Sequence, residues 1–266
     1  MTLKLHAMTC GWLDMPYGLM LEGREGVLRV PLPSFLIEHP KGTVLFDTGL
    51  PLGMQGDKES QRKEIGETAD AIEPCFNAGE EVSARLRAGG FDPDRIDILI
   101  NSHLHPDHAG GNALIPNARW ILQEREWACG CSAHSEEHLM FKSHYDLGHD
   151  RHFVDGEHDV FGDGSVVCMP TYGHTPGHQS LRLKLDEGEV ILTADACYLR
   201  QTLEQLHLPG ILDDKEEMLK SLEFLRKRRS NGARLILGHD PVTWPSINKG
   251  PLAEVTYAQI KAAPFS

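Results

Sequence analysis

The sequence predicts an α/β sandwich, with β-sheets inside and helices outside. Short apolar runs typical of strands recur from the first fifty residues to residue 237, and segments with helical patterns lie between them. No linker or break in composition divides the 266 residues. We therefore expect one α/β domain over residues 1–266.

The N-terminal quarter combines a β-rich part with a polar one. The runs 34–38 and 43–47 are short and apolar, and Pro40-Lys41-Gly42 between them is a turn signal, so they predict a hairpin. Residues 51–79 are polar and show little periodicity, which predicts a mobile excursion across one face of the fold. Its role is open between a solvated insertion and a wall of a binding pocket.

The middle of the chain alternates helix and strand signals. Residues 80–88 predict a helix that stops at Gly89-Gly90, strands are expected at 96–100 and 119–122, and 124–128 begins another helix. The segment 130–160 is polar, and its histidines are irregularly spaced. We interpret them as surface residues, one of which could line a pocket: His134, His138, His144, His149, His152 and His158.

The C-terminal half contains strand patterns and the strongest helix. The strand patterns are 165–169, 180–185, 190–193 and 234–237. Residues 213–229 form an amphipathic helix pattern that begins with two aspartates and ends with the basic run 226–229. Charges in this order complement a helix dipole, so we interpret the basic run as a last helical turn.

Composition restricts the partners and the compartment. The net charge of −13 disfavours nucleic acid and anionic membranes. No stretch approaches the roughly 18 apolar residues of a membrane helix, and no charged leader precedes an apolar run. The six cysteines show no framework spacing. Cys129 and Cys131 could bind a metal or form a strained bridge, but reduced thiols in a cytoplasmic protein are the preferred interpretation.

A histidine-rich motif follows the strand expected at 96–100. His103 and His105 are two residues apart, so on an extended segment both point to the same side and can share one metal. Asp107 has the same parity. Pro106 breaks the regular structure, after which His108 can approach from another side. The motif can therefore divide its ligands between two neighbouring metal ions.

Three later strand ends each carry one further candidate ligand. His174 lies within Gly-His-Thr-Pro-Gly-His after the strand at 165–169, Asp195 follows the strand at 190–193, and His239 follows the strand at 234–237. Any one of them alone would be an ordinary polar loop residue. Together with the histidine motif they predict a two-metal hydrolytic site.

This ordered set of motifs resembles that of the metallo-β-lactamase superfamily. The resemblance implies an αββα sandwich, two mixed β-sheets flanked by helices, with a binuclear site between the sheets. It implies three groups of metal ligands: His103, His105 and His174 for one ion, Asp107, His108 and His239 for the second, and Asp195 as a bridge. His178 matches a position outside the ligand set, and Asp47 matches one that supports the site.

Within the superfamily, the chain is most similar to N-acyl-homoserine lactone lactonases. Residues 101–112 match their motif almost as written, and Tyr198 stands three residues after Asp195, as in those quorum-quenching enzymes. Pro106 departs from their pattern, in which an aromatic residue is common. The resemblance implies a hydrolase that opens a lactone ring to an N-acyl-homoserine by attack of a metal-bridging hydroxide, with Tyr198 and Asp107 as catalytic residues.

The implied cofactors are two divalent metal ions, with zinc favoured and manganese, iron or cobalt open. The expected partner is a small-molecule lactone, with no nucleic acid and no membrane, and a homodimer is among the states that the sequence allows. The alternatives are hydrolysis of another lactone, of a thioester as in glyoxalase II, or of a phosphotriester. A binding protein that kept the metals but lost catalysis is the alternative from another class.

Overall fold

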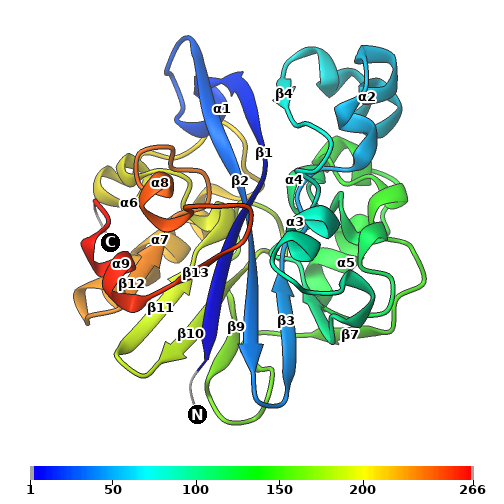
Figure 1. Ribbon diagram of the computed structural model, residues 1–266. Helices are drawn as coiled ribbons and strands as arrows, with labels where there is room; N and C mark the ends of the chain where they lie inside the picture. The colour runs from blue at the N-terminus through cyan, green and yellow to red at the C-terminus, as the bar shows by residue number, and fades with distance from the viewer. Residues whose placement is uncertain (1–2, 265–266) are drawn as a thin grey trace.

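The computed structural model describes residues 3–264, and within them the strands form two sheets that pack face to face (Figure 1). The larger sheet contains, in spatial order, β13 (Ala253–Val255), β1 (Lys4–Pro16), β2 (Val27–His39), β3 (Gly42–Phe46), β5 (Ile98–Ile100), β6 (Arg119–Gln123) and β7 (Arg151–Val154), and β4 (Glu73–Cys75) pairs with β1. The smaller sheet contains β12 (Arg234–Ile236), β11 (Gly188–Leu192), β10 (Gln179–Leu185), β9 (Val166–Pro170) and β8 (His158–Asp159). Both sheets are mixed, because each combines antiparallel with parallel pairs.

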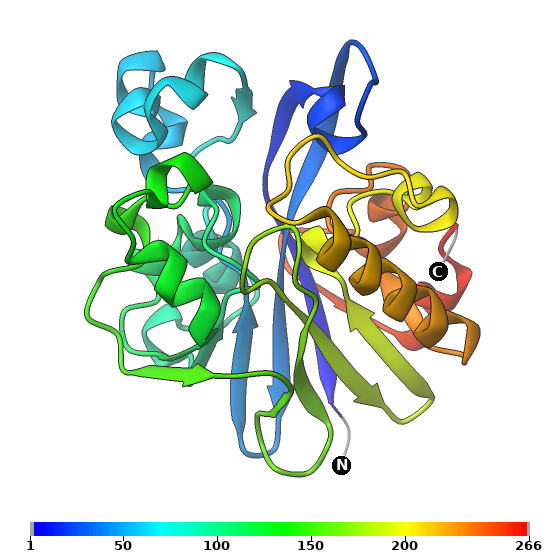
Figure 2. The ribbon, with the colours of Figure 1, turned by 180° about the vertical axis from the view of Figure 1, so that it is seen from behind.

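Helices cover the outer faces of both sheets (Figures 1 and 2). Those against the larger sheet are α3 (Val82–Ala88), α4 (Pro106–Ala109) and α5 (Glu124–Gly130), and those against the smaller sheet are α6 (Arg200–Gln205) and α7 (Lys215–Ser230). Near the edges of the sandwich lie α1 (Tyr17–Met20), α2 (Lys58–Ile65), α8 (Trp244–Ile247) and α9 (Tyr257–Ala262). The predicted αββα arrangement is confirmed.

The main core lies between the two sheets. In β3, Val44 and Phe46 point into this core, while Leu45 packs on the outer face beneath the helices. In β11, Val190 and Leu192 point inward and Ile191 packs outward. Strands that are buried on both faces are apolar at every position, which is why these segments appear in the sequence as continuous apolar runs.

The strongest sequence signals agree with the structure. The predicted hairpin is the antiparallel pair β2–β3, in which Phe35 stands opposite Phe46. The predicted helix 213–229 is α7, where Asp214 accepts hydrogen bonds from the backbone N–H groups of Glu216 and Glu217. The basic run forms its last turn, as predicted.

The polar segment 51–79 is more regular than we expected. It contains α2, the one-turn 3₁₀ helices Leu52–Gln55 and Gly66–Asp70, and strand β4. Asp57 caps α2 by accepting from Ser60 N, and Ile65 at the end of α2 is buried. A short helix with one buried face needs few apolar residues, so its periodicity is weak in the sequence.

The prediction that the histidines of 130–160 are surface residues is wrong for two of them. His144 and His149 are buried. His144 Nε2 lies 3.0 Å from a carboxylate oxygen of Glu64 on α2, and His149 Nε2 donates to the Ile115 carbonyl oxygen at 2.9 Å. These partners offset the cost of burying the ring, and nothing in the local sequence signals them.

Two further observations concern residues 3–264. The six cysteines are all free thiols. Among the described helices, none is both long enough and apolar enough to cross a bilayer.

Candidate metal centre

The predicted ligands lie where strands end. His103 and His105 follow β5, His174 follows β9, Asp195 follows β11 and His239 follows β12. Because β11 and β12 are parallel neighbours, their ends deliver Asp195 and His239 to the same edge of the smaller sheet. The structure brings all seven predicted ligands together in two adjacent clusters.

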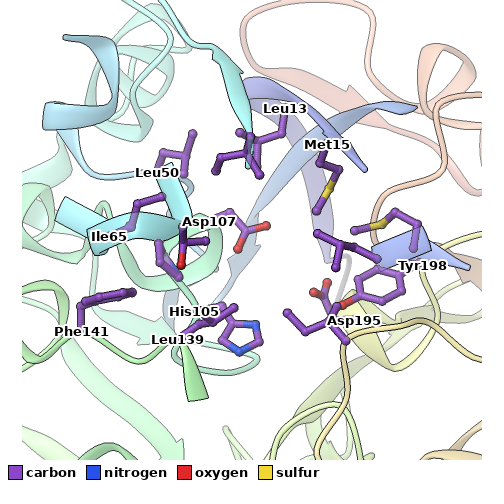
Figure 3. Close-up of a pocket in the computed structure, with 16 residues that line it drawn as sticks. Leu13, Met15, Leu50, Ile65, His105, Asp107, Leu139, Phe141, Asp195 and Tyr198 are labelled. Carbon is purple, nitrogen blue, oxygen red and sulfur yellow. The ribbon is translucent and has the colours of Figure 1, made fainter. Parts of the chain in front are cut away.

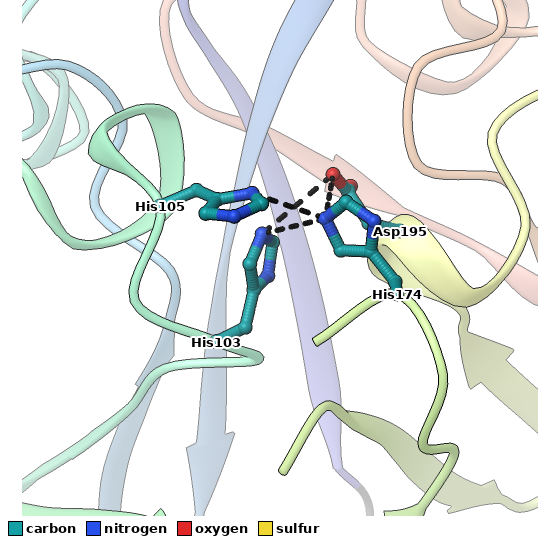
Figure 4. Close-up of side chains that lie close together, drawn as sticks. All are labelled: His103, His105, His174 and Asp195. Atoms are coloured by element: carbon teal, nitrogen blue, oxygen red, sulfur yellow. Dashed lines mark hydrogen bonds and ion pairs between the residues drawn. The ribbon is translucent and has the colours of Figure 1, made fainter. Parts of the chain in front are cut away.

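The first cluster joins His103, His105, His174 and Asp195 (Figure 4). His174 Nε2 lies 3.2 Å from His103 Nε2 and 3.1 Å from His105 Nδ1. Asp195 Oδ2 lies 3.3 Å from His174 Nε2. One ligand atom from each residue lies within 4.8 Å of the others, and all four side chains are buried.

The second cluster joins Asp107, His108 and His239. Asp107 Oδ2 lies 3.5 Å from His108 Nε2 and 3.6 Å from His239 Nε2. Asp195 also faces this cluster, because its Oδ1 lies 3.1 Å from His108 Nε2 and 3.0 Å from His239 Nε2. The two oxygens of Asp195 thus face different clusters, which is the placement expected of a bridging ligand.

Backbone carbonyls fix the protonation of two imidazoles. His105 Nε2 lies 3.1 Å from the carbonyl oxygen of His138, and His239 Nδ1 lies 2.8 Å from that of Pro31. A carbonyl only accepts, so these nitrogens carry the protons. In the neutral rings, the nitrogens that face the clusters, Nδ1 of His105 and Nε2 of His239, carry the free lone pairs.

Asp47 fixes two more imidazoles, as its predicted supporting position suggests. Its Oδ2 accepts from His108 Nδ1 at 2.9 Å and from Ser102 Oγ at 2.9 Å. Since the Ser102 hydroxyl donates to Asp47, its oxygen accepts from His103 Nδ1 at 2.9 Å. His103 and His108 therefore also turn Nε2 toward the clusters, where it can bind a cation once the ring is neutral.

The donor set fits divalent cations. His108 Nε2, His239 Nε2 and Asp195 Oδ1 are buried and have no hydrogen-bond partner among the described residues. Lone pairs that converge at about 3 Å without a proton between them repel one another, and a cation removes that repulsion. Imidazole nitrogens and carboxylate oxygens are common ligands of zinc and its neighbours.

The electrostatics of the two clusters differ. Burial and the neighbouring imidazoles hold the pKa values of His103 and His105 well below the ordinary value. Burial also lowers the pKa of His108, but the carboxylates of Asp195, Asp107 and Asp47 outweigh it and raise that pKa well above the ordinary value. The second cluster therefore has the stronger local demand for positive charge.

His178 lies outside both clusters, as predicted. Its Nε2 accepts from the backbone N–H of Asp195 at 3.1 Å, and its Nδ1 lies 2.9 Å from Thr171 Oγ1. Burial lowers the pKa of His178 to about 3, so the ring is neutral and can accept. His178 therefore orients Asp195.

Tyr198 stands beside the first cluster. Its side chain is 1% exposed, and its hydroxyl oxygen lies 3.1 Å from His174 Nδ1. Burial, together with the carboxylates of Asp195 and Asp107, raises the pKa of Tyr198 well above its ordinary value. The phenol therefore remains protonated and can donate a hydrogen bond.

An apolar pocket opens onto the clusters (Figure 3). It contains about 620 Å³ of empty space, part of it open to solvent, and its lining includes Asp107, Asp195 and Tyr198. The walls are mostly aliphatic or aromatic and come from five parts of the chain: Leu13, Met15, Leu19, Met20, Leu50, Ile65, Ile72, Leu139, Phe141 and Ile211.

Sequence reasoning did not identify most of this pocket. Ile65, Thr68 and Ile72 belong to the segment 51–79, so the structure makes that segment a pocket wall rather than an insertion without a role. Leu139 and Phe141 come from the histidine-rich segment. Their spacing carries no signal, because the wall forms only when distant loops fold together.

Comparisons with known proteins agree with the geometry. Residues 29–239 match the family model of the metallo-β-lactamase superfamily. The N-acyl homoserine lactonase AttM of Azorhizobium caulinodans is 33% identical over 243 residues, 87% of this chain and 90% of that protein. The N-acyl homoserine lactonase AiiA of Bacillus thuringiensis subsp. kurstaki is 30% identical over 224 residues, 80% of this chain and 83% of that protein.

A solved structure shares the fold over almost the whole chain. It is an N-acyl homoserine lactone hydrolase with the product N-hexanoyl-L-homoserine bound at its catalytic metal centre. The two superpose with a TM-score of 0.85 at 26% sequence identity, covering 96% of this chain and 100% of the other.

Proposed function

The chain belongs to the metallo-β-lactamase superfamily and is a metal-dependent hydrolase of it, and we propose that it opens N-acyl-homoserine lactones to N-acyl-homoserines. The observation that carries this proposal is the apolar pocket whose lining includes residues of both clusters and Tyr198. A lactone with an acyl chain has the same two parts, a polar ester ring and an apolar tail. Relatives named as N-acyl homoserine lactonases support the same substrate class.

The seven clustered residues would hold two metal ions, for which zinc is the proposed identity. His103, His105 and His174 would hold one, Asp107, His108 and His239 the other, and Asp195 would be shared. Bound divalent cations supply a nucleophile derived from water at neutral pH and polarise the ester carbonyl. The remaining steps depend on side chains of this chain.

Tyr198 would stabilise the negative charge that develops on the carbonyl oxygen. Its phenol is protonated and buried, and it lines the pocket together with Asp195. As water adds to the carbonyl carbon, the hydroxyl would donate a hydrogen bond to the oxygen that becomes negative. Donors that are already in place cost no reorganisation when the charge appears.

Asp107 would move the proton. It is the most exposed of the clustered residues, with 20% of its side chain accessible, and it lines the pocket. When the ring C–O bond breaks, the leaving alkoxide oxygen needs one proton; the attacking water gives up two, one of which goes to the alkoxide while the other is released to solvent. Asp107 can carry the first of these protons to the alkoxide, which yields the carboxylate and the free hydroxyl of an N-acyl-homoserine.

The experiment is a hydrolysis assay of the metal-loaded protein with a matched substrate panel. We expect turnover of N-acyl-homoserine lactones, and weaker turnover of a γ-lactone without an acyl chain, because it leaves the pocket empty. A thioester and a phosphotriester represent the alternative hydrolase activities, and a β-lactam represents the superfamily's name. Preference for any of these three over every lactone would contradict the proposal, and no turnover at all would favour a metal-binding protein without catalysis.

A further inference from the structure

One buried carboxylate lies between the two loops that carry the three histidines of the first cluster. Glu126 is in the first turn of α5, and its side chain is fully buried although it carries an ionisable group. It is not one of the clustered residues, and nothing in the proposed reaction uses it. A carboxylate in such a place needs a physical reason, because its burial costs several kcal/mol unless donors compensate it.

The hydrogen bonds of Glu126 reach both loops. Its Oε1 accepts from the backbone N–H of Leu104 at 2.9 Å, and Leu104 stands between His103 and His105. Its Oε2 accepts from Thr175 Oγ1 at 2.8 Å and from the backbone N–H of Gly177 at 2.9 Å. Thr175 directly follows His174 in the chain. One carboxylate thus ties together the two segments that supply the three histidines of the first cluster.

The connection continues from the second loop to Asp195. Gly177 is followed by His178, whose Nε2 accepts from the backbone N–H of Asp195 at 3.1 Å. Glu126 therefore fixes the loop that also orients the residue shared by the two clusters. None of its hydrogen bonds reaches Asp107, His108 or His239.

The packing around Gly177 points to the same contact. A Cβ atom added to Gly177 would collide with the backbone nitrogen and the Cβ of Glu126. The loop thus touches the start of α5 so closely that only glycine fits. This close approach brings the Gly177 N–H within reach of the carboxylate, and it does not depend on how the hydrogen bonds are assigned.

We propose that Glu126 is a positioning residue for the first metal cluster, holding the His103–His105 segment and the His174 loop at the separation that one ion requires. This inference rests on the two-metal site of the proposed function, but it does not depend on the substrate. Residues that orient metal ligands in this way typically contribute 10- to 100-fold to metal affinity.

Two substitutions distinguish the effect of the side-chain length of Glu126 from the effect of its charge. Glu126→Gln keeps the length but removes the charge, and since all three partners are donors, its amide nitrogen must face one of them. Glu126→Asp keeps the charge but is one methylene shorter, so it cannot span both loops. Tyr145→Phe is the matched control, because it removes another buried hydrogen bond to α5, from Tyr145 Oη to the Gly130 carbonyl oxygen, and neither loop takes part in that bond.

The measurement is metal affinity, obtained by titrating Zn²⁺ against a chromophoric chelator. His105→Ala and His239→Ala assign the two binding steps of the wild-type protein to the first and second clusters. We expect both Glu126 variants to weaken the first-cluster step by about 10- to 100-fold and to leave the second step within about threefold of wild type. Co²⁺ absorption spectra should change for the first-cluster ion alone, and Tyr145→Phe should match the wild type.

Three outcomes would overturn the proposal: wild-type affinity at both clusters, equal weakening of both, or weakening of the second cluster alone. If Glu126→Gln does not fold, Thr175→Val provides the same test more gently, because it removes one donor and keeps the carboxylate. A smaller, selective loss at the first cluster then supports the proposal, and an unchanged first cluster overturns it. A wild-type protein that binds two metal ions but opens no lactone would refute the proposed function alone.

Discussion

Replacing Tyr198 by phenylalanine removes one buried hydroxyl group and leaves the ring in place. The ring centroid of Tyr198 lies 5.4 Å from that of His174 and 5.5 Å from that of His239, and phenylalanine keeps both contacts. The lost hydroxyl lies 3.1 Å from His174 Nδ1, but that nitrogen retains the Ile211 carbonyl oxygen at 3.4 Å. The substitution should therefore change neither the metal ligands nor the packing around them.

The expected loss is in the transition state. Removing one donor to a developing oxyanion costs about 10²–10³ in kcat, or about 2.7–4 kcal/mol. By contrast, the net contribution of an ordinary hydrogen bond to stability is only about 1 kcal/mol. Turnover should therefore fall at least 100-fold on this estimate, while KM and thermal stability change little. If the Tyr198 hydroxyl only packs against its neighbours, its removal should leave turnover unchanged.

The assay is steady-state ring opening, followed by acid release in weakly buffered solution, with elemental analysis of the same protein samples. Tyr145→Phe is the matched control, since it removes the same chemical group from a buried position away from the clusters. Unchanged kinetics for Tyr198→Phe would remove the hydroxyl from the mechanism. A loss of activity that parallels a loss of metal would assign Tyr198 to the metal site instead.

Three further predictions follow from the geometry. Asp195→Asn keeps the size of the side chain but removes the charge between the clusters, so elemental analysis should find fewer than two metal ions per chain; two ions held as tightly as in the wild type would contradict the bridging role. Because the pocket wall is apolar, kcat/KM for N-acyl-homoserine lactones should rise by up to about fourfold for each methylene added to the acyl chain until the pocket is filled. Equal kcat/KM values for all substrates from butanoyl to dodecanoyl would contradict the placement of the acyl chain in the pocket. Burial raises the pKa of Cys10 and Cys168 to about 12, which leaves almost no thiolate at mildly alkaline pH. Mass spectrometry should therefore find that iodoacetamide labels exposed Cys131 first and these two cysteines only after unfolding. Rapid labelling of Cys10 or Cys168 in the native protein would show that its thiol is accessible.

The sequence predicted those parts of the fold whose side chains alone carry the signal. Strands such as β3 and β11 are buried on both faces, so their apolar runs stand out, and α7 has an apolar face together with capping and terminal charges. The short strands β7 and β13 were not predicted. They join the larger sheet through backbone hydrogen bonds, and half-buried side chains such as His152 give no strand pattern.

The candidate site likewise contains residues that the sequence predicts and residues that only the structure reveals. The seven clustered residues could be found from the sequence because four of them form one compact histidine motif and the other three each follow a strand pattern, in an order that is distinctive only when all are taken together. The pocket wall and Glu126 could not, since an aliphatic side chain or a single glutamate looks the same wherever it lies. Their roles depend on contacts such as the one between Leu104 and Glu126, which only the folded chain creates.

The two sheets contribute different candidate ligands to the clusters, which links metal binding to folding. His103, His105, Asp107 and His108 follow a strand of the larger sheet, whereas His174, Asp195 and His239 follow strands of the smaller one. Each cluster takes ligands from both sheets, so neither is complete until the main core between the sheets has formed. Binding free energy at such a site adds to the free energy of folding, because the unfolded chain holds no preformed site. Bound metal ions should therefore hold the two sheets together at the edge where the clusters lie. Removing the ions should increase the mobility of the ends of β5, β9, β11 and β12 before it affects the opposite edge of the sandwich.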